Sequence, residues 1–81
     1  MDNYAKLLQV VADLFRVDSK TLNDNSSQDS LRNWDSIGTV SLVSELEQVF
    51  GVRFDVLEVQ DLKNIGIIKS VLAEKGIAFP S

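Results

Sequence analysis

Apolar residues recur at helical spacing in three stretches of the chain, separated by polar connections. In residues 3–16, intervals of three and four place these side chains on one face: Tyr4, Leu7, Leu8, Val11, Leu14 and Phe15. In residues 36–50 the inner stripe is Ile37, Val40, Val43, Leu46 and Phe50, widened by Leu42 and Val49. In residues 64–74 it is Ile65, Ile68, Val71 and Leu72. The spacing therefore predicts three amphipathic helices.

Capping residues support these boundaries. Asp2 or Asn3 can start the first helix and Asn64 the last, because their side-chain oxygens accept free backbone N–H groups. Gly51 suits the left-handed residue that ends the second helix. Residues 55–62 are long enough for only one or two turns. We therefore predict an all-α fold, a small four-helix bundle with a short third helix and a long first loop, in a single domain spanning residues 1–81.

The long first connection, residues 18–34, is rich in Ser, Asn and Asp, which compete with helices for backbone hydrogen bonds. Its apolar residues are Leu22, Leu31 and Trp34. We interpret its middle as a strap pinned by the two leucines, and we expect Trp34 to pack on the edge of the bundle rather than to contact a ligand. The tail, residues 77–81, is expected to fray.

Composition narrows the possible functions. The 81 residues include no cysteine and no histidine, which excludes disulfides, thiolate catalysis and Cys-ligated zinc and removes the commonest general base. A self-sufficient hydrolase or transferase is therefore not favoured. The net charge is −4, and residues 35–62 alone hold six acids against Arg53, so nucleic acid is a poor partner. With no apolar run near the roughly 20 residues of a membrane span and no signal peptide, we expect no membrane span and a cytoplasmic location.

The stretch from Trp34 to Val40, WDSIGTV, holds the candidate chemistry. Ser36 sits where a loop turns into a helix, whose first N–H groups lack intrahelical partners. A phosphate ester on that hydroxyl would find donors in place and the positive end of the helix dipole beside it. Gly38 has no side chain, so a bulky substituent can lie close to the backbone. Taken alone, the same residues are better explained as an ordinary N-cap formed by Asp35 or Ser36, because Asp and Ser are favoured at any helix start.

The motif resembles the attachment site of acyl carrier proteins. The resemblance runs through Asp35, Ser36, Ile37 and Gly38 and continues along the second helix with Thr39, Val40, Leu42, Leu46, Glu47, Phe50 and Gly51. It implies that Ser36 carries 4′-phosphopantetheine, attached by a phosphopantetheinyl transferase that supplies magnesium and the base. It also implies a carrier rather than an enzyme, because the reactive thiol belongs to the attached arm. Asp35, Ile37 and Gly38 would then surround the cofactor.

Glu45 and Glu47 have no basic neighbour three or four residues away, so no intrahelical ion pair explains them. The resemblance implies a docking surface for basic partner enzymes, to which Ser41 and Gln48 also belong. A solvated face that keeps the domain soluble explains these acids equally well. A non-catalytic helical interaction module that binds through this acidic face is the alternative function.

The motif departs from fatty-acid carriers, which usually have acids in place of Gly38, Ser41 and Gln48. The Gly-Thr-Val sequence is more similar to D-alanyl and other specialised free-standing carriers. We therefore expect a short acyl or amino acid as cargo, loaded by a dedicated ligase and unloaded by downstream transferases. We also expect a monomer that acts in lipid or secondary-metabolite biosynthesis. The sequence leaves open whether the apolar interior is an ordinary core or opens to shelter an acyl chain.

Overall fold

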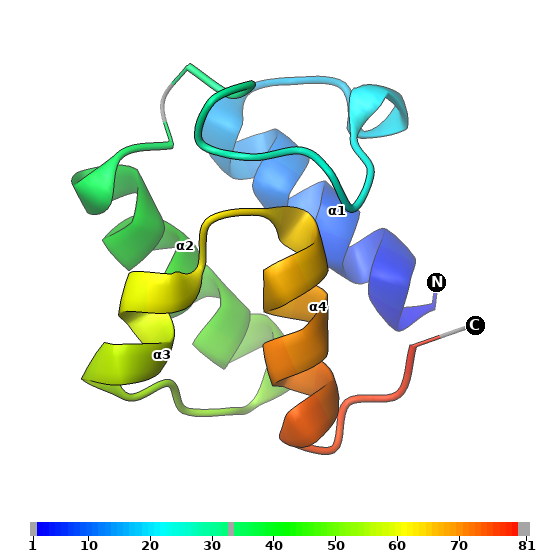
Figure 1. Cartoon of the computed structure of the whole chain (residues 1–81). Coiled ribbons are helices and arrows are strands. Elements are labelled where there is room, and N and C mark those ends of the chain that lie inside the picture. Colours follow the sequence, from blue (N-terminus) through cyan, green and yellow to red (C-terminus); the bar gives the residue numbers. More distant parts are fainter. Residues whose placement is uncertain (1, 33, 80–81) are drawn as a thin grey trace.

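The computed structural model describes residues 2–32 and 34–79. In these ranges the chain forms four α-helices and one short 3₁₀ helix: α1 (Asn3–Phe15), η1 (Ser19–Thr21), α2 (Ser36–Phe50), α3 (Val56–Asp61) and α4 (Ile65–Glu74). In Figure 1, α2 lies on one side with the short α3 beside it, α4 occupies the middle, and α1 lies on the other side. The prediction of an all-α bundle with a short third helix and a long first loop is confirmed.

Each α-helix begins with an acid or amide cap. Asp2, Asp35, Asp55 and Asn64 each accept a backbone N–H from the first turn of α1, α2, α3 and α4 respectively. At α3 the cap is reciprocal, because Glu58 also accepts the backbone N–H of Asp55 at 2.9 Å. Gly51 ends α2 with φ = +67°, the left-handed conformation predicted for it. The helix boundaries thus follow from local hydrogen bonding.

The core is formed by α1, α2, α4, the residue that follows α3, and three residues of the long loop, Leu22, Leu31 and Trp34. Its fully buried large side chains are Leu7, Val11, Leu42, Leu46, Leu62, Ile65, Ile68 and Leu72. Burial of each contributes about 1.5–3 kcal/mol relative to exposure. No residue within α3 itself is buried, so the short helix is anchored mainly by Leu62 at its end.

The predicted inner stripe of α2 is wrong in its first two turns. Ile37 and Val40 are 79% and 63% exposed, and Val49 is also exposed, whereas Thr39, Leu42 and Leu46 are buried. Apolar residues surround most of this helix, so spacing alone could not select the packed face. A threonine can lie inside because its hydroxyl is hydrogen-bonded there. The residues predicted to face outward, namely Ser41, Ser44, Glu45 and Gln48, are exposed.

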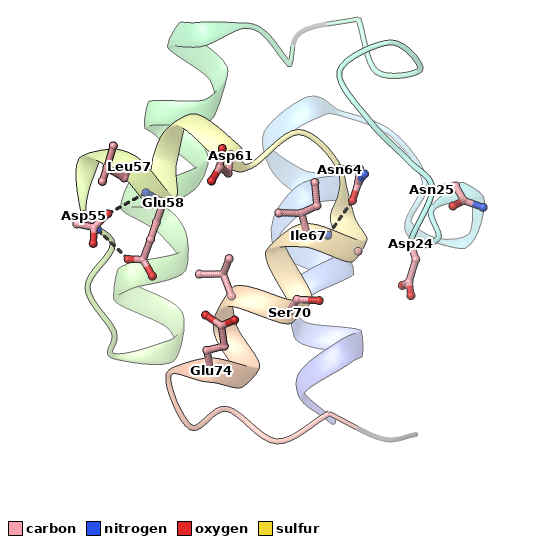
Figure 2. Close-up of a pocket in the computed structure, with 12 residues that line it drawn as sticks. Asp24, Asn25, Asp55, Leu57, Glu58, Asp61, Asn64, Ile67, Ser70 and Glu74 are labelled. Atoms are coloured by element: carbon pink, nitrogen blue, oxygen red, sulfur yellow. Dashed lines mark hydrogen bonds between the residues drawn. The ribbon is translucent and has the colours of Figure 1, made fainter.

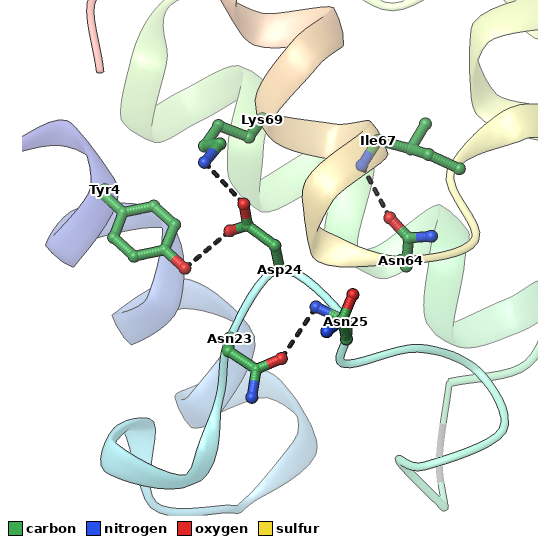
Figure 3. A network of polar contacts seen from close by, with 7 residues as sticks. All are labelled: Tyr4, Asn23, Asp24, Asn25, Asn64, Ile67 and Lys69. Atoms are coloured by element: carbon green, nitrogen blue, oxygen red, sulfur yellow. Dashed lines mark hydrogen bonds and ion pairs between the residues drawn. The ribbon is translucent and has the colours of Figure 1, made fainter. Parts of the chain in front are cut away.

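The long loop is a strap, as predicted, with Leu22 and Leu31 buried. It also covers the start of α4, which the sequence did not indicate. The backbone oxygens of Ser26 and Asp24 accept the N–H groups of Ile65 and Gly66, both at 2.9 Å. Figure 3 shows the side chain of Asp24 reaching both α1 and α4. The strap therefore supplies acceptors that a helix start would otherwise take from water.

The tail does not fray over residues 77–79. Ile77 and Phe79 pack against the core, and the Ala78 carbonyl accepts a hydrogen bond from Asn3 Nδ2 at 2.8 Å. Apolar contact with the bundle outweighs the disorder expected of a terminus. Pro80 and Ser81 lie outside the described residues. Within the described residues, no helix has the length and apolar character needed to cross a membrane.

Candidate functional site

Ser36 is the first residue of α2, and its side chain is exposed. Asp35 caps the helix: its Oδ1 accepts the Gly38 N–H at 2.8 Å, and its backbone oxygen accepts the Thr39 N–H at 2.8 Å. Among residues 2–32 and 34–79, the N–H groups of Ser36 and Ile37 find no acceptor. These two first-turn donors lie next to the Ser36 hydroxyl, where an anion can meet them.

The surroundings of Ser36 suit a phosphate ester. The positive end of the dipole of a 15-residue helix favours an anion there by about 0.3–1 kcal/mol. Gly38 is half-buried and its N–H is already bound to Asp35, which leaves the other two N–H groups to meet the phosphate oxygens. These residues fit a phosphate-linked group on the Ser36 oxygen.

Nothing in the described part of the chain activates the Ser36 hydroxyl. Its oxygen makes no hydrogen bond to any described residue, and the sequence contains no histidine. A resident nucleophile needs a base within hydrogen-bond reach. Among the described residues, no base lies within hydrogen-bond distance of the Ser36 oxygen.

Trp34 packs inside the bundle, more deeply than the edge position predicted for it. Only 2% of it is exposed, and its ring stacks on Phe15 of α1 with a centroid distance of 5.6 Å. Its indole Nε1–H donates to Thr39 Oγ1 at 3.1 Å. The residue two positions before Ser36 is thus a core residue, as expected from the preference of lone tryptophans for packing.

Apolar side chains are exposed beside Ser36 and on α3, although the spacing predicted Ile37 and Val40 in the core. Ile37 and Val40 project from the first turns of α2, on either side of Gly38 and Thr39. On α3, which packs beside α2, Val56 and Leu57 are each 73% exposed. The sequence did contain a signal for this exposure: α2 has more apolar residues than a single buried face can hold. Such exposed residues are typical of a surface that contacts another molecule.

The four predicted partner-binding residues differ in their exposure. Ser41, Glu45 and Gln48 are exposed along the outer face of α2. Glu47 is half-buried, and its Oε2 accepts the backbone N–H of Phe54 at 2.9 Å. Glu47 therefore fastens the connection between α2 and α3, a structural role that a helical-neighbour search could not detect.

A second group of acids surrounds an open depression of about 590 Å³ between α3 and α4. Figure 2 shows the acidic side chains that line it: Asp24, Asp55, Glu58, Asp61 and Glu74. The hydrogen bond from Lys75 and the capping contact with Asp55 hold the pKa of Glu58 below its usual value. Across the described residues, no cluster of acids is arranged to hold a metal ion.

Comparison with known proteins gives a family match and a similar fold. A family model described as "Phosphopantetheine attachment site" matches residues 5–72. A search of curated protein sequences gives no match. Among solved structures, the fold is similar to that of a Mycobacterium tuberculosis protein described as an acyl carrier protein. The TM-score is 0.79 at 19% sequence identity, over 89% of this chain and 96% of the other. That likeness shows the fold, and the family match shows that residues 5–72 contain a phosphopantetheine attachment site.

Proposed function

Because the chain belongs to the phosphopantetheine attachment-site family, we propose that Ser36 is the serine that holds the arm. As a member of that family, the chain is a carrier protein with covalently bound 4′-phosphopantetheine. The observation that carries the assignment to Ser36 is its place as an exposed serine at the first position of an α-helix. The other serines between residues 5 and 72 lie in the long loop or inside helices: Ser19, Ser26, Ser27, Ser30, Ser41, Ser44 and Ser70.

The proposed attachment reaction uses coenzyme A as the donor of the arm and a transferase as the catalyst. The Ser36 oxygen forms a new bond to phosphorus, the pyrophosphate bond of coenzyme A breaks, and adenosine bisphosphate leaves. The hydroxyl proton passes to a base on the transferase, since the Ser36 hydroxyl makes no hydrogen bond to a described residue that could accept it. The N–H groups of Ser36 and Ile37 are placed to bind the phosphate oxygens. When attached, the arm supplies the thiol that forms a thioester with the cargo.

The chain does not act as an enzyme itself in this proposal. Membership of a carrier family implies interaction with modifying and biosynthetic enzymes. The specific partners proposed are a phosphopantetheinyl transferase, a ligase that loads an acyl or aminoacyl group, and downstream transferases. The exposed Ile37 and Val40 flank the attachment site, so any enzyme that reaches Ser36 meets them.

The direct test of Ser36 is incubation of the apo protein with coenzyme A, magnesium and a broad-specificity transferase, followed by intact mass measurement. We expect one added phosphopantetheine in the wild type and in Ser41→Ala, and none in Ser36→Ala. The Ser41 variant is the matched control, because it removes an exposed hydroxyl from the same helix. No mass gain with several transferases overturns the proposal. An interaction module would instead keep its function in Ser36→Ala and lose it when Glu45 is replaced.

The cargo proposed is a short acyl or amino acid loaded by a dedicated ligase. Ser41 and Gln48 are exposed on the outer face of α2 beside Glu45, so this face has fewer acids than fatty-acid carriers usually have. Fewer surface charges slow association with basic partners. The holo protein should therefore be a poor substrate for the malonyl transferase of fatty-acid synthesis.

The double variant Ser41→Glu with Gln48→Glu should raise the rate of malonyl loading, most clearly at low salt, where charges are least screened. The replacements are on the exposed face, so the fold should be unaffected. If the wild type already loads as fast as a fatty-acid carrier, these positions do not determine partner choice.

A further inference from the structure

The first turn of α2 has almost no apolar anchor. Ser36, Ile37 and Val40 are exposed, and the first buried apolar residue of the helix is Leu42. The one buried side chain before it is the polar residue Thr39, which is 5% exposed. Helix ends fray when packing does not hold them. Something other than hydrophobic contact must therefore keep this turn in place.

A chain of hydrogen bonds supplies that support. Trp34 Nε1–H donates to Thr39 Oγ1 at 3.1 Å, and Thr39 Oγ1 donates to the backbone oxygen of Asp35 at 2.9 Å. The direction is fixed, because an indole N–H only donates and a threonine hydroxyl has a single proton to give. These two hydrogen bonds, which we call the relay, join residues on both sides of Ser36. Since Trp34 also stacks on Phe15, it ties the turn to α1.

We propose that Trp34 and Thr39 are positioning residues for attachment of the arm, an inference that rests on Ser36 being the attachment site. Both are buried, so the transferase cannot contact them directly. They act by keeping Ser36 and the first-turn N–H groups beside it in helical geometry. If only a fraction of the molecules had that geometry, the apparent affinity of the transferase would fall by the same fraction. The relay therefore acts on KM rather than on kcat.

The test uses a pair of variants at one position. Thr39→Val keeps the shape of the side chain and removes the hydroxyl, whereas Thr39→Ser keeps the hydroxyl. Transferase kinetics are measured at a temperature where circular dichroism shows every variant folded. We expect Thr39→Val to raise KM about three- to tenfold with kcat little changed. Thr39→Ser should restore the wild-type KM.

A matched control separates positioning from stability. Tyr4→Phe removes a hydroxyl that also joins two segments, through a 2.7 Å bond to Asp24, at the opposite end of α1 from Phe15. It should lower stability and leave KM unchanged. An equal rise of KM in Tyr4→Phe and Thr39→Val, or no rise in Thr39→Val, overturns the inference.

A second measurement does not depend on the transferase. Amide hydrogen exchange at Gly38 and Thr39 should be faster in Thr39→Val and normal in Thr39→Ser. If Thr39→Val does not fold, Trp34→Phe replaces it, because it removes the indole donor and keeps an aromatic ring against Phe15. It should also raise KM, and an unchanged KM overturns the inference. Failure of the wild type to accept the arm refutes the Ser36 assignment and this inference together, whereas normal modification with an unchanged KM refutes only the positioning role.

Discussion

Replacement of Asp24 by asparagine should destabilise the fold near neutral pH and much less in acid. Asp24 lies in the long loop and accepts two side-chain hydrogen bonds, from Tyr4 of α1 and from Lys69 of α4, each at 2.7 Å. Lys69 Nζ also lies 5.0 Å from the centre of the Tyr4 ring. Figure 3 shows how this carboxylate joins three segments. Asp24→Asn keeps the size of the side chain and removes its charge.

The size of the expected loss of stability depends on how exposed the interacting side chains are. The side chains of Lys69 and Asp24 are 30% and 46% exposed, so water screens the ion pair, and its loss costs about 0.2–1 kcal/mol. Tyr4 would exchange a charge-assisted hydrogen bond for a neutral one, a loss of about 1 kcal/mol. The total is about 1–2 kcal/mol. At roughly 4–8 °C per kcal/mol for a domain of this size, Tm should fall by about 4–16 °C.

The pH dependence has a definite sign. The hydrogen bond from Lys69, followed by that from Tyr4, lowers the pKa of Asp24 in the folded state. A lowered folded-state pKa gives stability that is fully present above the unfolded value and is lost as pH falls through the folded value. The gap between wild type and variant should therefore be full near pH 7 and shrink below about pH 4, where the unfolded carboxyl also protonates.

Urea unfolding followed by the fluorescence of Trp34, the single tryptophan, measures this gap at each pH. Asp29→Asn is the matched control. It makes the same change in the same loop, at a carboxylate with no hydrogen-bond or ion-pair partner among the described residues. It should change stability little at either pH. A gap for Asp24→Asn that is equal at neutral and acid pH would refute the reasoning.

Four further predictions concern residues that end or join helices and the tyrosine of α1. Leu62→Ala removes the buried anchor after α3 and should cost about 2–5 kcal/mol in urea unfolding. Gly51→Ala should cost about 1–2 kcal/mol in the same assay from its positive φ alone, since a Cβ there meets no atom within 4 Å. Lys75→Met breaks the 2.8 Å ion pair with Glu58 and should speed amide exchange in α3 near neutral pH. That effect should fade as pH falls through the lowered pKa of Glu58, and an undiminished effect in acid would contradict it. Burial and the hydrogen bond to Asp24 raise the pKa of Tyr4 to about 12, so its stabilising effect should persist to about pH 10 and disappear through pH 12, as spectrophotometric titration can measure.

Local features of the sequence were sufficient to predict where the helices lie. The bounds of α2 were predicted to the residue because its start and stop depend on adjacent residues: Asp35 caps it and Gly51 ends it. Asn64 marked the start of α4 for the same reason. The place of Ser36 at a helix start was equally predictable. Its role was not, because any helix can begin with Asp-Ser, and it was the resemblance to carrier proteins that suggested an attached arm.

Spacing predicted the buried faces of α1 and α4, but which face of α2 is buried was decided only by the tertiary structure. Ile37 and Val40 have the spacing of core residues and are exposed, while Thr39 is buried because Trp34 lies there to donate to it. Likewise, Glu47 accepts a hydrogen bond from the backbone N–H of Phe54, which is not among its helical neighbours three and four residues away.

The strap over α4 and the folded tail depend on contacts between distant parts of the chain. Asp24 binds Lys69, 45 residues away, and Asn3 binds the carbonyl of Ala78, 75 residues away. The sequence by itself determined where each helix begins and ends, because capping and periodicity act over three or four residues. Only the tertiary structure decided which polar side chains meet between helices, because those hydrogen bonds require groups from separate segments to come within about 3 Å at the right angle.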